Sequence, residues 1–345
     1  MRKKRNLKKI LSIKQVKYWL LIIVFLAFIS FLLFKGKEIY SFYFSTNHST
    51  EEIVFFISRE DTVPIIAQNL VDMKIISNSK KFVNYLVQSK KDKIVQAGEF
   101  ILYKGMNNKE VVDIITSKDA FIKYRFIILE GYTIRDVSHT LEKINLVNEK
   151  EFSELNIQNF SIPFLQQTPS TLEGFLFPDT YILPRVGINE IISIILSNFN
   201  EKIGSLVNDS PVVKELGFYK ALILASIVEK EARVEEERPL IASVFYNRLK
   251  KGMLLQSCAT INYVLKEPKE RLTYDDLAII SPYNTYLHAG LPPTPIANPG
   301  LSSIKAAFYP STTNYLYFVH KGDGTHEFSR TLEEHNQAKR KYLNP

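Results

Sequence analysis

Two glutamates, Glu229 and Glu231, end an otherwise apolar stretch of the chain, LILASIVEKEA at residues 222–232. A carboxyl group held among apolar side chains has a raised pKa, which is how an enzyme keeps an acid protonated near neutral pH. In a helix, positions two apart point about 200° away from each other, so the two carboxyl groups cannot serve one site. The stretch therefore predicts a general acid supplied by one of them.

Glu229 lies on the helix face of Leu222, Ala225 and Ala232, where the small alanines leave room for a ligand. Residues 221–228 are apolar on nearly every face, which predicts a buried helix leading into Glu229. The alternative is structural, because Glu229 and Arg233 also form an ordinary i,i+4 pair. On the pattern alone, the structural interpretation is the commoner outcome.

The elements around the glutamates are mostly helical. Helical patterns cover residues 189–204 and 212–251, interrupted at Pro239, which follows acids and precedes apolar positions as in the first turn of a new helix. Residues 281–310 read as a long loop rich in Pro, Asn and Gly. Two short strands joined by a KGDG turn and a last helix at 331–343 follow, so the fold class is α+β.

A basic segment and an apolar run open the chain. Residues 1–17 carry eight Lys and Arg and no acid, and residues 18–34 form a 17-residue run without a charge. As a helix that run spans roughly 25 Å and can cross a bilayer when flanking lysines snorkel. No small-residue cleavage site follows, so we expect a retained single transmembrane helix. The charge bias predicts an N-terminus in the cytoplasm, with the rest of the chain outside the cytoplasmic membrane.

Charge and cysteine content argue against two other classes of protein. The net charge of +8 comes from residues 1–17, and the remaining basic and acidic side chains balance, so no nucleic-acid partner is expected. The single cysteine, Cys258, cannot form an internal disulfide. We interpret it as a buried structural thiol rather than a nucleophile.

A strand-helix-helix pattern follows a polar linker at residues 35–52 and occurs a second time. Phe126 stands 71 residues after Phe55, and Thr133 stands 71 residues after Thr62. A duplicated module explains the match. Because Thr62 and Thr133 are both good helix N-caps, the chemistry of helix starts explains it equally well.

Several long motifs occur in order from about residue 124 to the C-terminus. They are LEGFLFPDTY, ASIVEKEA, ERPLIASVFYNRLKKGMLLQS, SPYNTYLHAGLPPTPIANPG and the series YLYFV, THEF and HNQ. Together they resemble the endolytic murein transglycosylase (YceG-like) family. The resemblance implies a LysM-like module at residues 53–122 and a mixed α+β catalytic domain at 123–345. If the module is duplicated, residues 123–152 are a second LysM-like half-repeat.

The resemblance also implies a reaction, the cleavage of peptidoglycan glycan strands, with the first glutamate of IVEKE, Glu229, as the catalytic residue. The acid protonates the oxygen between MurNAc and GlcNAc, and its carboxylate then takes the proton of the MurNAc C6 hydroxyl, leaving a 1,6-anhydro end. Because the nucleophile is tethered to the reacting ring, one carboxyl group suffices and no cofactor is expected.

Further residues match the family's motifs and are expected to contact the sugar: Glu173, Gln256, Tyr283, Asn284, Tyr286 and His326. For each there is a structural alternative, since turn acids and loop aromatics are often simply packed. Cys258 stands where the family is expected to have Asp, which puts the rate in doubt more than the reaction type. The spacing of His320, His326 and His335 fits no zinc pattern, so no metal site is expected.

Two other classes of function fit the same residues. One is a non-catalytic peptidoglycan-binding scaffold of the wall synthesis machinery. The other is a glycoside hydrolase that pairs Glu229 with a second acid such as Asp179 or Glu173. In each case the expected partners are glycan strands, peptidoglycan synthases and the membrane.

Overall fold

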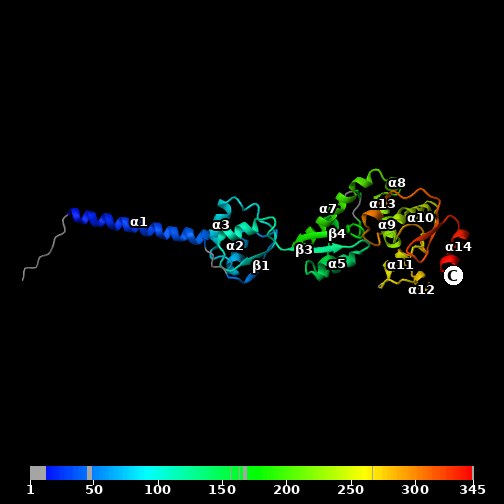
Figure 1. The fold of residues 1–345 in the computed structure, drawn as a ribbon, viewed down its shortest axis with the longest axis horizontal. Helices are drawn as coiled ribbons and strands as arrows, with labels where there is room; N and C mark the ends of the chain where they lie inside the picture. The colour runs from blue at the N-terminus through cyan, green and yellow to red at the C-terminus, as the bar shows by residue number, and fades with distance from the viewer. Residues whose placement is uncertain are drawn as a thin grey trace, which may run out of the picture. The chain divides into compact units, whose positions relative to one another are not determined.

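The computed structural model describes residues 13–44, 49–155, 157–162, 164–165, 169–265 and 267–343. The chain divides into two compact units, Met1–Ile122 and Lys123–Pro345 (Figure 1). Most of the predicted basic segment at 1–17 lies outside the described residues. Helix α1, Ile13–Phe44, contains the predicted apolar run, and residues Lys17–Lys37 are long and apolar enough to cross a membrane.

The first unit contains a small module after α1. Strand β1, Glu52–Ile57, pairs antiparallel with β2, Gly98–Tyr103, and Phe55 lies opposite Phe100. Alternate residues of β1 point inward, which buries Phe55 and Ile57 against three amphipathic helices. These helices are α2 (Val63–Asp72), α3 (Ser79–Gln88) and α4 (Asn108–Ile115).

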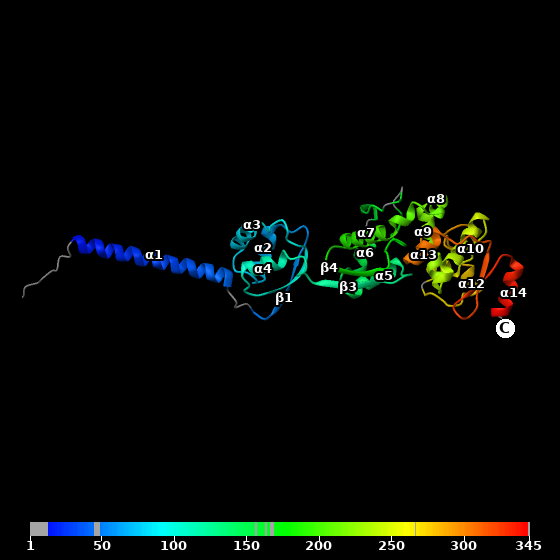
Figure 2. The same ribbon diagram turned by 45° about the horizontal axis from the view of Figure 1, so that its top comes forward.

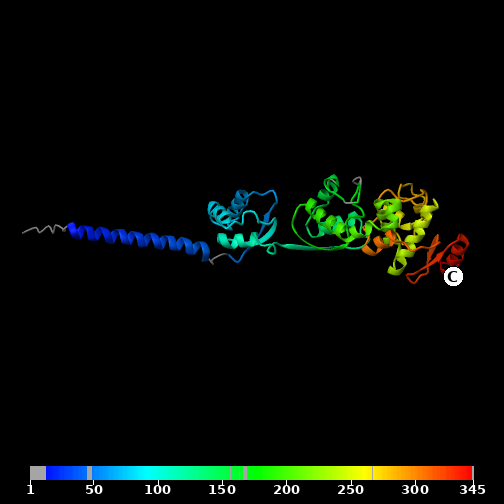
Figure 3. The same ribbon diagram turned by 90° about the horizontal axis from the view of Figure 1, so that it is seen from above.

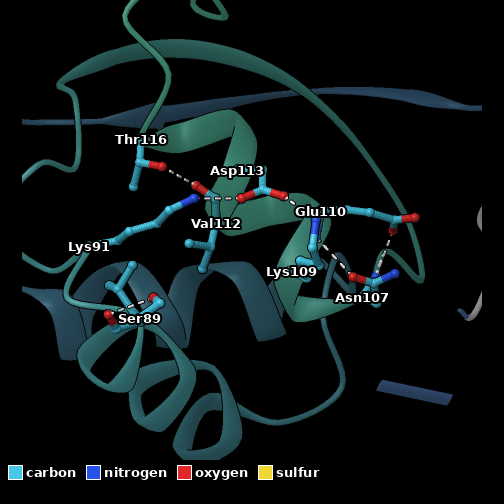
Figure 4. Close-up of polar contacts among 9 residues, drawn as sticks. Ser89, Lys91, Asn107, Lys109, Glu110, Val112, Asp113 and Thr116 are labelled. Carbon is cyan, nitrogen blue, oxygen red and sulfur yellow. Dashed lines mark hydrogen bonds and ion pairs between the residues drawn. The ribbon is translucent and has the colours of Figure 1, made fainter. Parts of the chain in front are cut away.

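Polar contacts fix α4 within this module (Figure 4). Asn107 and Glu110 form a reciprocal capping box at its N-terminus, which satisfies backbone N–H groups that the helix itself leaves unpaired. The carboxylate oxygens of Asp113 accept hydrogen bonds from the Nζ atoms of Lys91 and Lys109, each at 2.6 Å. Such exposed ion pairs contribute little to stability, so the module is held mainly by its apolar core.

The second unit begins with the same order of elements (Figure 2). Strand β3, Lys123–Ile128, pairs antiparallel with β4, Asp179–Pro184. The helices are α5 (Ile134–Lys143), α6 (Glu149–Ser153) and α7 (Ile188–Val207), with a 3₁₀ turn at Ile157–Asn159. The residues spaced 71 apart are buried in both units: Phe55 and Phe126, Ile66 and Val137, Leu70 and Leu141, Ile76 and Val147.

The two helix starts differ in detail. Thr133 forms a capping box with Asp136, whereas Thr62 occupies the N-cap position without a side-chain hydrogen bond. Capping chemistry is therefore not what the two segments share, and the common feature is the set of buried apolar positions.

A helical core follows the second module. It contains α8 (Pro211–Leu216), α9 (Phe218–Glu231), α10 (Arg238–Lys250), α11 (Cys258–Val264), α12 (Tyr274–Leu277) and α13 (Leu301–Phe308). A 3₁₀ turn at Glu235–Glu237 precedes α10, and Pro239 lies in the first turn of α10 as the sequence predicted. Helix α9 is buried on all sides from Ala221 to Val228 and packs against α13 and α10.

The expectation of a loop through residues 281–310 is wrong for its last part. Residues 301–308 form α13, whose Ile304, Ala307 and Phe308 are fully buried. The prolines and glycines that suggested a loop all precede Leu301, apart from the final Pro310. Gly300 is the N-cap of this helix.

The chain ends in a hairpin and a helix (Figure 3). Strand β5, Tyr317–His320, pairs antiparallel with β6, His326–Ser329, and α14, Leu332–Leu343, lies against both strands. The predicted turn falls between the strands, with Gly322 and Gly324 both at φ +96°.

Asn298 joins three distant segments of the second unit. Its backbone N–H and its side-chain amide both donate to the carbonyl of Tyr132, at 2.7 and 2.9 Å. Its side-chain oxygen accepts the N–H groups of Gly174 and Leu176, both at 2.9 Å. The residue is fully buried, so these bonds fix the loop after β3 and the turn before β4 against the segment that leads into α13.

Candidate active site

The two glutamates at the end of α9 point to different places. The acceptor atoms of Glu229 face Arg238 and Gly300, whereas those of Glu231 face Ser257 and Ala259. This separation is the one expected from helix geometry. Each glutamate is therefore considered with its own neighbours.

Glu229 is bonded to protein groups at both oxygens. Oε1 lies 3.3 Å from Nη1 of Arg238, and Oε2 accepts the N–H of Gly300 at 2.9 Å. The side chain is 6% exposed. The room beside the alanines is filled by the backbone of Gly300, where an added Cβ would lie 1.9 Å from an oxygen of Glu130. These contacts tie α9 to the starts of α10 and α13.

Glu130 adds a second carboxyl group on this side of α9. Its Oε2 lies 4.0 Å from Nη2 of Arg238, and half of its side chain is exposed. Partial burial and the negative charge of Glu229 raise the pKa of Glu130. Arg238 therefore faces two carboxyl groups, and these contacts hold the end of α9 to the start of α10. None of the three side chains lines a pocket described below.

Glu231 lines a pocket of about 430 Å³. The hydroxyl of Ser257 donates to Oε1 of Glu231, and the N–H of Ala259 lies 3.5 Å from the same oxygen. Burial raises the pKa of Glu231, while the bonds from Ser257 and Ala259 and the positive charge of His326 act in the opposite direction. The side chain thus has a raised pKa and faces a hollow large enough for part of a sugar chain.

The residues around this pocket come from six elements, α9, α10, α11, β5, β6 and α14, and from two loop segments. They are Glu231, Phe245, Arg248, Leu255, Gln256, Cys258, Tyr286, Phe318, Val319, His320, His326, His335 and Lys339. Among these lining residues Glu231 is the only acid. In the described residues no group of three or more His, Cys, Asp and Glu is placed to hold a metal ion.

The segment after α10 forms one edge of the pocket and is held tightly. Arg248 donates to the carbonyls of Leu255 and Leu316, at 2.8 and 2.6 Å. Gln256 has φ +53°, a left-handed backbone that non-glycine residues rarely adopt, and its N–H donates to Thr285. With this backbone conformation Gln256 lines the pocket, and the hydroxyl of Ser257 bonds the carboxyl group of Glu231.

Cys258 is not the buried thiol that the sequence suggested. It is exposed at the pocket, where its sulfur lies 3.1 Å from the hydroxyl of Tyr286. Burial of the sulfur atom and the charge of Glu231 still raise the pKa of the thiol. A raised pKa disfavours the thiolate, so the geometry gives Cys258 no activation as a nucleophile.

His326 lines the pocket, and the mostly buried carboxylate of Glu237 holds its ring. Its Nδ1 lies 2.7 Å from Oε2 of Glu237, and its backbone N–H donates to Oε1 of the same carboxylate at 3.0 Å. The side chains are 6% and 13% exposed. A carboxylate on Nδ1 orients the ring and leaves Nε2 as the free nitrogen.

Glu173 lies away from the pocket, contrary to expectation. It is completely buried, accepts the N–H of Ile134 at 3.0 Å and receives the hydroxyl of Tyr263 at 3.2 Å. Burial raises its pKa to about 8. Glu173 is a structural acid between the second module and the helical core, next to Asn298.

Tyr283 and Asn284 shape the loop that carries Tyr286. The amide of Asn284 donates to the carbonyls of Leu277 and Ile279, and its oxygen accepts the N–H of Tyr286 at 2.9 Å. The hydroxyl of Tyr283 bonds Thr294 at 2.8 Å. Of the predicted sugar contacts, the structure therefore brings Gln256, Tyr286 and His326 into one pocket and leaves Glu173, Tyr283 and Asn284 outside it.

Sequence reasoning did not name Glu237, Arg248 or Lys339, gave His335 a groove-lining or architectural role from its HN motif, and set Glu231 aside in favour of Glu229. The helix before Glu231 is apolar on all faces, so its periodicity gave no direction for the site.

Comparison with known proteins shows which family the chain resembles. The YceG-like family matches residues 55–341. The chain is similar to a protein of Bacillus subtilis (strain 168) named endolytic murein transglycosylase, with 35% identity over 298 residues that cover 82% of each chain. It is also similar to a protein of the same name from Streptococcus pneumoniae (strain ATCC BAA-255 / R6), with 30% identity over 62% of this chain and 44% of that one.

A solved structure is similar in sequence and fold. It is the crystal structure of a yceG-like protein from Listeria monocytogenes, which is 33% identical in sequence and superposes with a TM-score of 0.53. The match covers 84% of this chain and 99% of the other.

Proposed function

Because the chain belongs to the YceG-like family, we propose that it is a lytic transglycosylase that cleaves peptidoglycan glycan strands internally. The observation that carries the proposal is the pocket in which Glu231 is the only acid among the lining residues. A glycosidase that uses water needs a second carboxyl group near the first, whereas a lytic transglycosylase uses the C6 hydroxyl of its own substrate.

We further propose that Glu231, rather than Glu229, is the general acid. Glu231 has a raised pKa and opens to the pocket, as a proton donor requires. It donates its proton to the oxygen between MurNAc and GlcNAc, and its carboxylate then accepts the proton of the C6 hydroxyl as O6 bonds to C1. The product is a strand that ends in 1,6-anhydroMurNAc.

His326 and Glu237 assist this acid. The carboxylate of Glu237 stabilises a positive charge on His326, and that charge favours the carboxylate form of Glu231. The pair thereby stabilises Glu231 once its proton has gone to the leaving oxygen. Gln256 and Tyr286 supply an amide and a phenol ring for hydrogen bonding to the sugar.

The proposed location is the outer face of the cytoplasmic membrane. The apolar part of α1 anchors the chain, the basic residues before it keep the N-terminus in the cytoplasm, and the LysM-like module holds glycan. In this position the enzyme meets nascent strands and the synthases that make them, and its cuts terminate strands. Deleting residues 1–37 is expected to release a soluble, folded protein, and membrane association of that fragment in high salt would contradict the anchor.

The test is the chemistry of the cut ends. Purified peptidoglycan is incubated with the full-length chain in detergent, and the digested strands are analysed by mass spectrometry. We expect 1,6-anhydroMurNAc ends. Reducing ends would mean a hydrolase, and intact strands would mean a non-catalytic scaffold.

A further inference from the structure

Four residues of the pocket form what we call the cationic wall: Arg248, His320, His335 and Lys339. They come from α10, β5 and α14, elements that do not carry the proposed acid. None of the four was needed for the proton transfers described above. Their shared property is that each side chain carries nitrogen. Burial lowers the pKa of both His320 and His335, so the positive charge of the wall belongs to Arg248 and Lys339.

The charge of this wall has no protein counter-ion in the described chain. The bonds of Arg248 go to oxygens of carbonyl or amide groups, and this side chain is part of a residue that is only 8% exposed. Lys339 is exposed and has no ion pair among the described residues, so its charge is screened by water and is available to a ligand. The guanidinium of Arg248 also lies over the ring of Tyr317, with Cζ 5.0 Å from the ring centroid. Carbonyl oxygens and an aromatic face satisfy part of its needs but supply no full negative charge, which is unfavourable for a buried cation.

The acids near the wall do not cancel this charge. Burial raises the pKa of Glu231, so this carboxyl group is favoured in its neutral form. The carboxylate of Glu237 is already bonded twice to His326. The other titratable groups that line the pocket are His326, the Cys258 thiol and the Tyr286 phenol, and the pKa values of the thiol and the phenol are both raised.

Two buried nitrogens of the wall bond no other atom of the described chain. Nδ1 of His320 accepts the N–H of Gly322 at 2.9 Å, which places the proton of the neutral ring on Nε2, and this Nε2 has no acceptor. Nδ1 of His335 is also buried without a partner, and its ring stacks on Tyr317. Buried polar atoms without partners are rare in proteins and indicate a ligand or a functional role.

We propose that the cationic wall binds a carboxylate of the glycan substrate. A carboxylate supplies the missing negative charge to Arg248 and Lys339 and accepts the unpaired N–H of His320. Hydroxyl and acetamido groups of the sugars carry no charge and satisfy only the second of these needs. This inference rests on the proposed function, because it concerns the same pocket and the same strand.

Carboxylates of a glycan strand have two sources. One is the lactyl group of a MurNAc residue that has lost its peptide, and the other is the stem peptide itself. The wall recognises the chemistry that both share, and the substrates of the test distinguish them.

The test measures binding and not cleavage, so it remains valid whether or not the strands are cut. The full-length chain with Glu231→Gln in detergent is titrated with short glycan strands by calorimetry. Three kinds of strand are used: peptide-free strands, the same strands with their carboxylates converted to methylamides, and strands with intact stem peptides. We expect at least one carboxylate-bearing strand to bind about tenfold more tightly than the capped strand.

The matched variants lie on α14. Lys339→Gln is expected to lower the affinity for the carboxylate-bearing strand by about fivefold to tenfold and to leave the affinity for the capped strand unchanged. Lys341→Gln is the control, because Lys341 lies over the ring of Tyr342 and lines a different pocket. Tighter binding of peptide-free strands assigns the lactyl carboxylate, and tighter binding of peptide-bearing strands assigns the stem.

Equal affinity for capped and uncapped strands, or an equal effect of Lys339→Gln on both, would overturn the proposal. Neither result would affect the proposed function, which depends on anhydro ends. Conversely, strands that bind with the expected preference but are left intact by the unmodified chain would refute the enzyme and keep the carboxylate site.

Discussion

Glu229 and Glu231 are two residues apart on one helix, and their surroundings differ in almost every respect. Glu229 is closed in by Arg238 and by the first turn of α13, and both of its oxygens are bonded to the protein core. Glu231 has a serine and a backbone N–H on one oxygen and a pocket beside it. One glutamate therefore holds helices together, and the other is available to a ligand.

The comparison teaches that burial alone does not identify a catalytic acid. Glu173 has a pKa raised to about 8 and is more deeply buried than either residue, yet it lines no described pocket. A useful acid needs both a raised pKa and a path to substrate. Among these three carboxyl groups, only Glu231 combines the two.

The largest effect is expected from exchanging the glutamates of α9 one at a time for glutamine. Glu231→Gln removes the donated proton and should lower the rate of anhydro-end formation by about 10²–10⁴-fold. Glu229→Gln should keep most activity per folded molecule, while the loss of charge opposite Arg238 lowers the melting temperature. Circular dichroism and a strand-cleavage assay measure both. An inactive Glu229→Gln beside an active Glu231→Gln would reverse our assignment and support the expectation drawn from the sequence.

The pair of Glu237 and His326 should have the next largest effect. Either Glu237→Gln or His326→Gln is expected to lower kcat by about tenfold to a hundredfold, because the Glu231 carboxylate loses a favourable charge. The same charge lowers the pKa of Glu231, so its loss raises this pKa and should move the alkaline limb of the kcat/KM profile to higher pH.

The neighbouring Glu236→Gln is the control, since Glu236 is exposed. A change in rate without a shift of the alkaline limb would mean that the pair only supports the fold.

Glu173→Gln should affect stability and leave catalysis nearly unchanged. The pKa of Glu173 is about 8 in the folded chain and lies near 4.5 when unfolded, so the folded state binds the proton more tightly. The stabilisation is complete below about pH 4.5 and is lost as the pH rises toward 8. Glutamine does not ionise, so the variant should gain about 1–3 kcal/mol relative to the parent between pH 5 and pH 8.

Urea unfolding of the second unit at several pH values measures this difference. A fall in kcat larger than about tenfold in the folded Glu173→Gln variant would place this acid in the reaction after all.

The smallest effect is expected at Cys258. Cys258→Ser replaces the thiol with a hydroxyl that can still bond Tyr286, so it should change the cleavage rate by less than about threefold. Cys258→Asp adds a negative charge beside Glu231 and should raise the pKa of that acid, which moves the alkaline limb upward without abolishing activity. Complete loss of activity in a folded Cys258→Ser variant would reveal a chemical role for the thiol.

The sequence predicted the elements better than the directions of side chains. The apolar run of α1, the helix break at Pro239, the two strands around the KGDG turn and the last helix all followed from local chemistry. Helix α13 was missed because its neighbours are rich in Pro and Gly, and its formation depends on burial against α9.

The site was harder to predict because it is built from tertiary contacts. Gln256, Tyr286 and His326 were found through motifs and do share a pocket. Glu237 lies 89 residues before His326, and no local pattern predicts that pair. The choice between the glutamates depended on which neighbours reach the end of α9, namely Gly300 and Ser257, and these come from opposite directions in the chain.

The bonds of Asn298 also bear on the order in which the chain folds. They join segments 122 to 166 residues apart, whereas the contacts of the first module link residues within about one module length. Closing such long loops is entropically costly and slow. As a chain leaves the ribosome from its N-terminus, the first module can fold early, while β3, β4 and the turn at Gly174 wait for residue 298. The pocket around Glu231 is therefore assembled only after nearly the whole chain has been made, which delays cleavage activity until synthesis is almost complete.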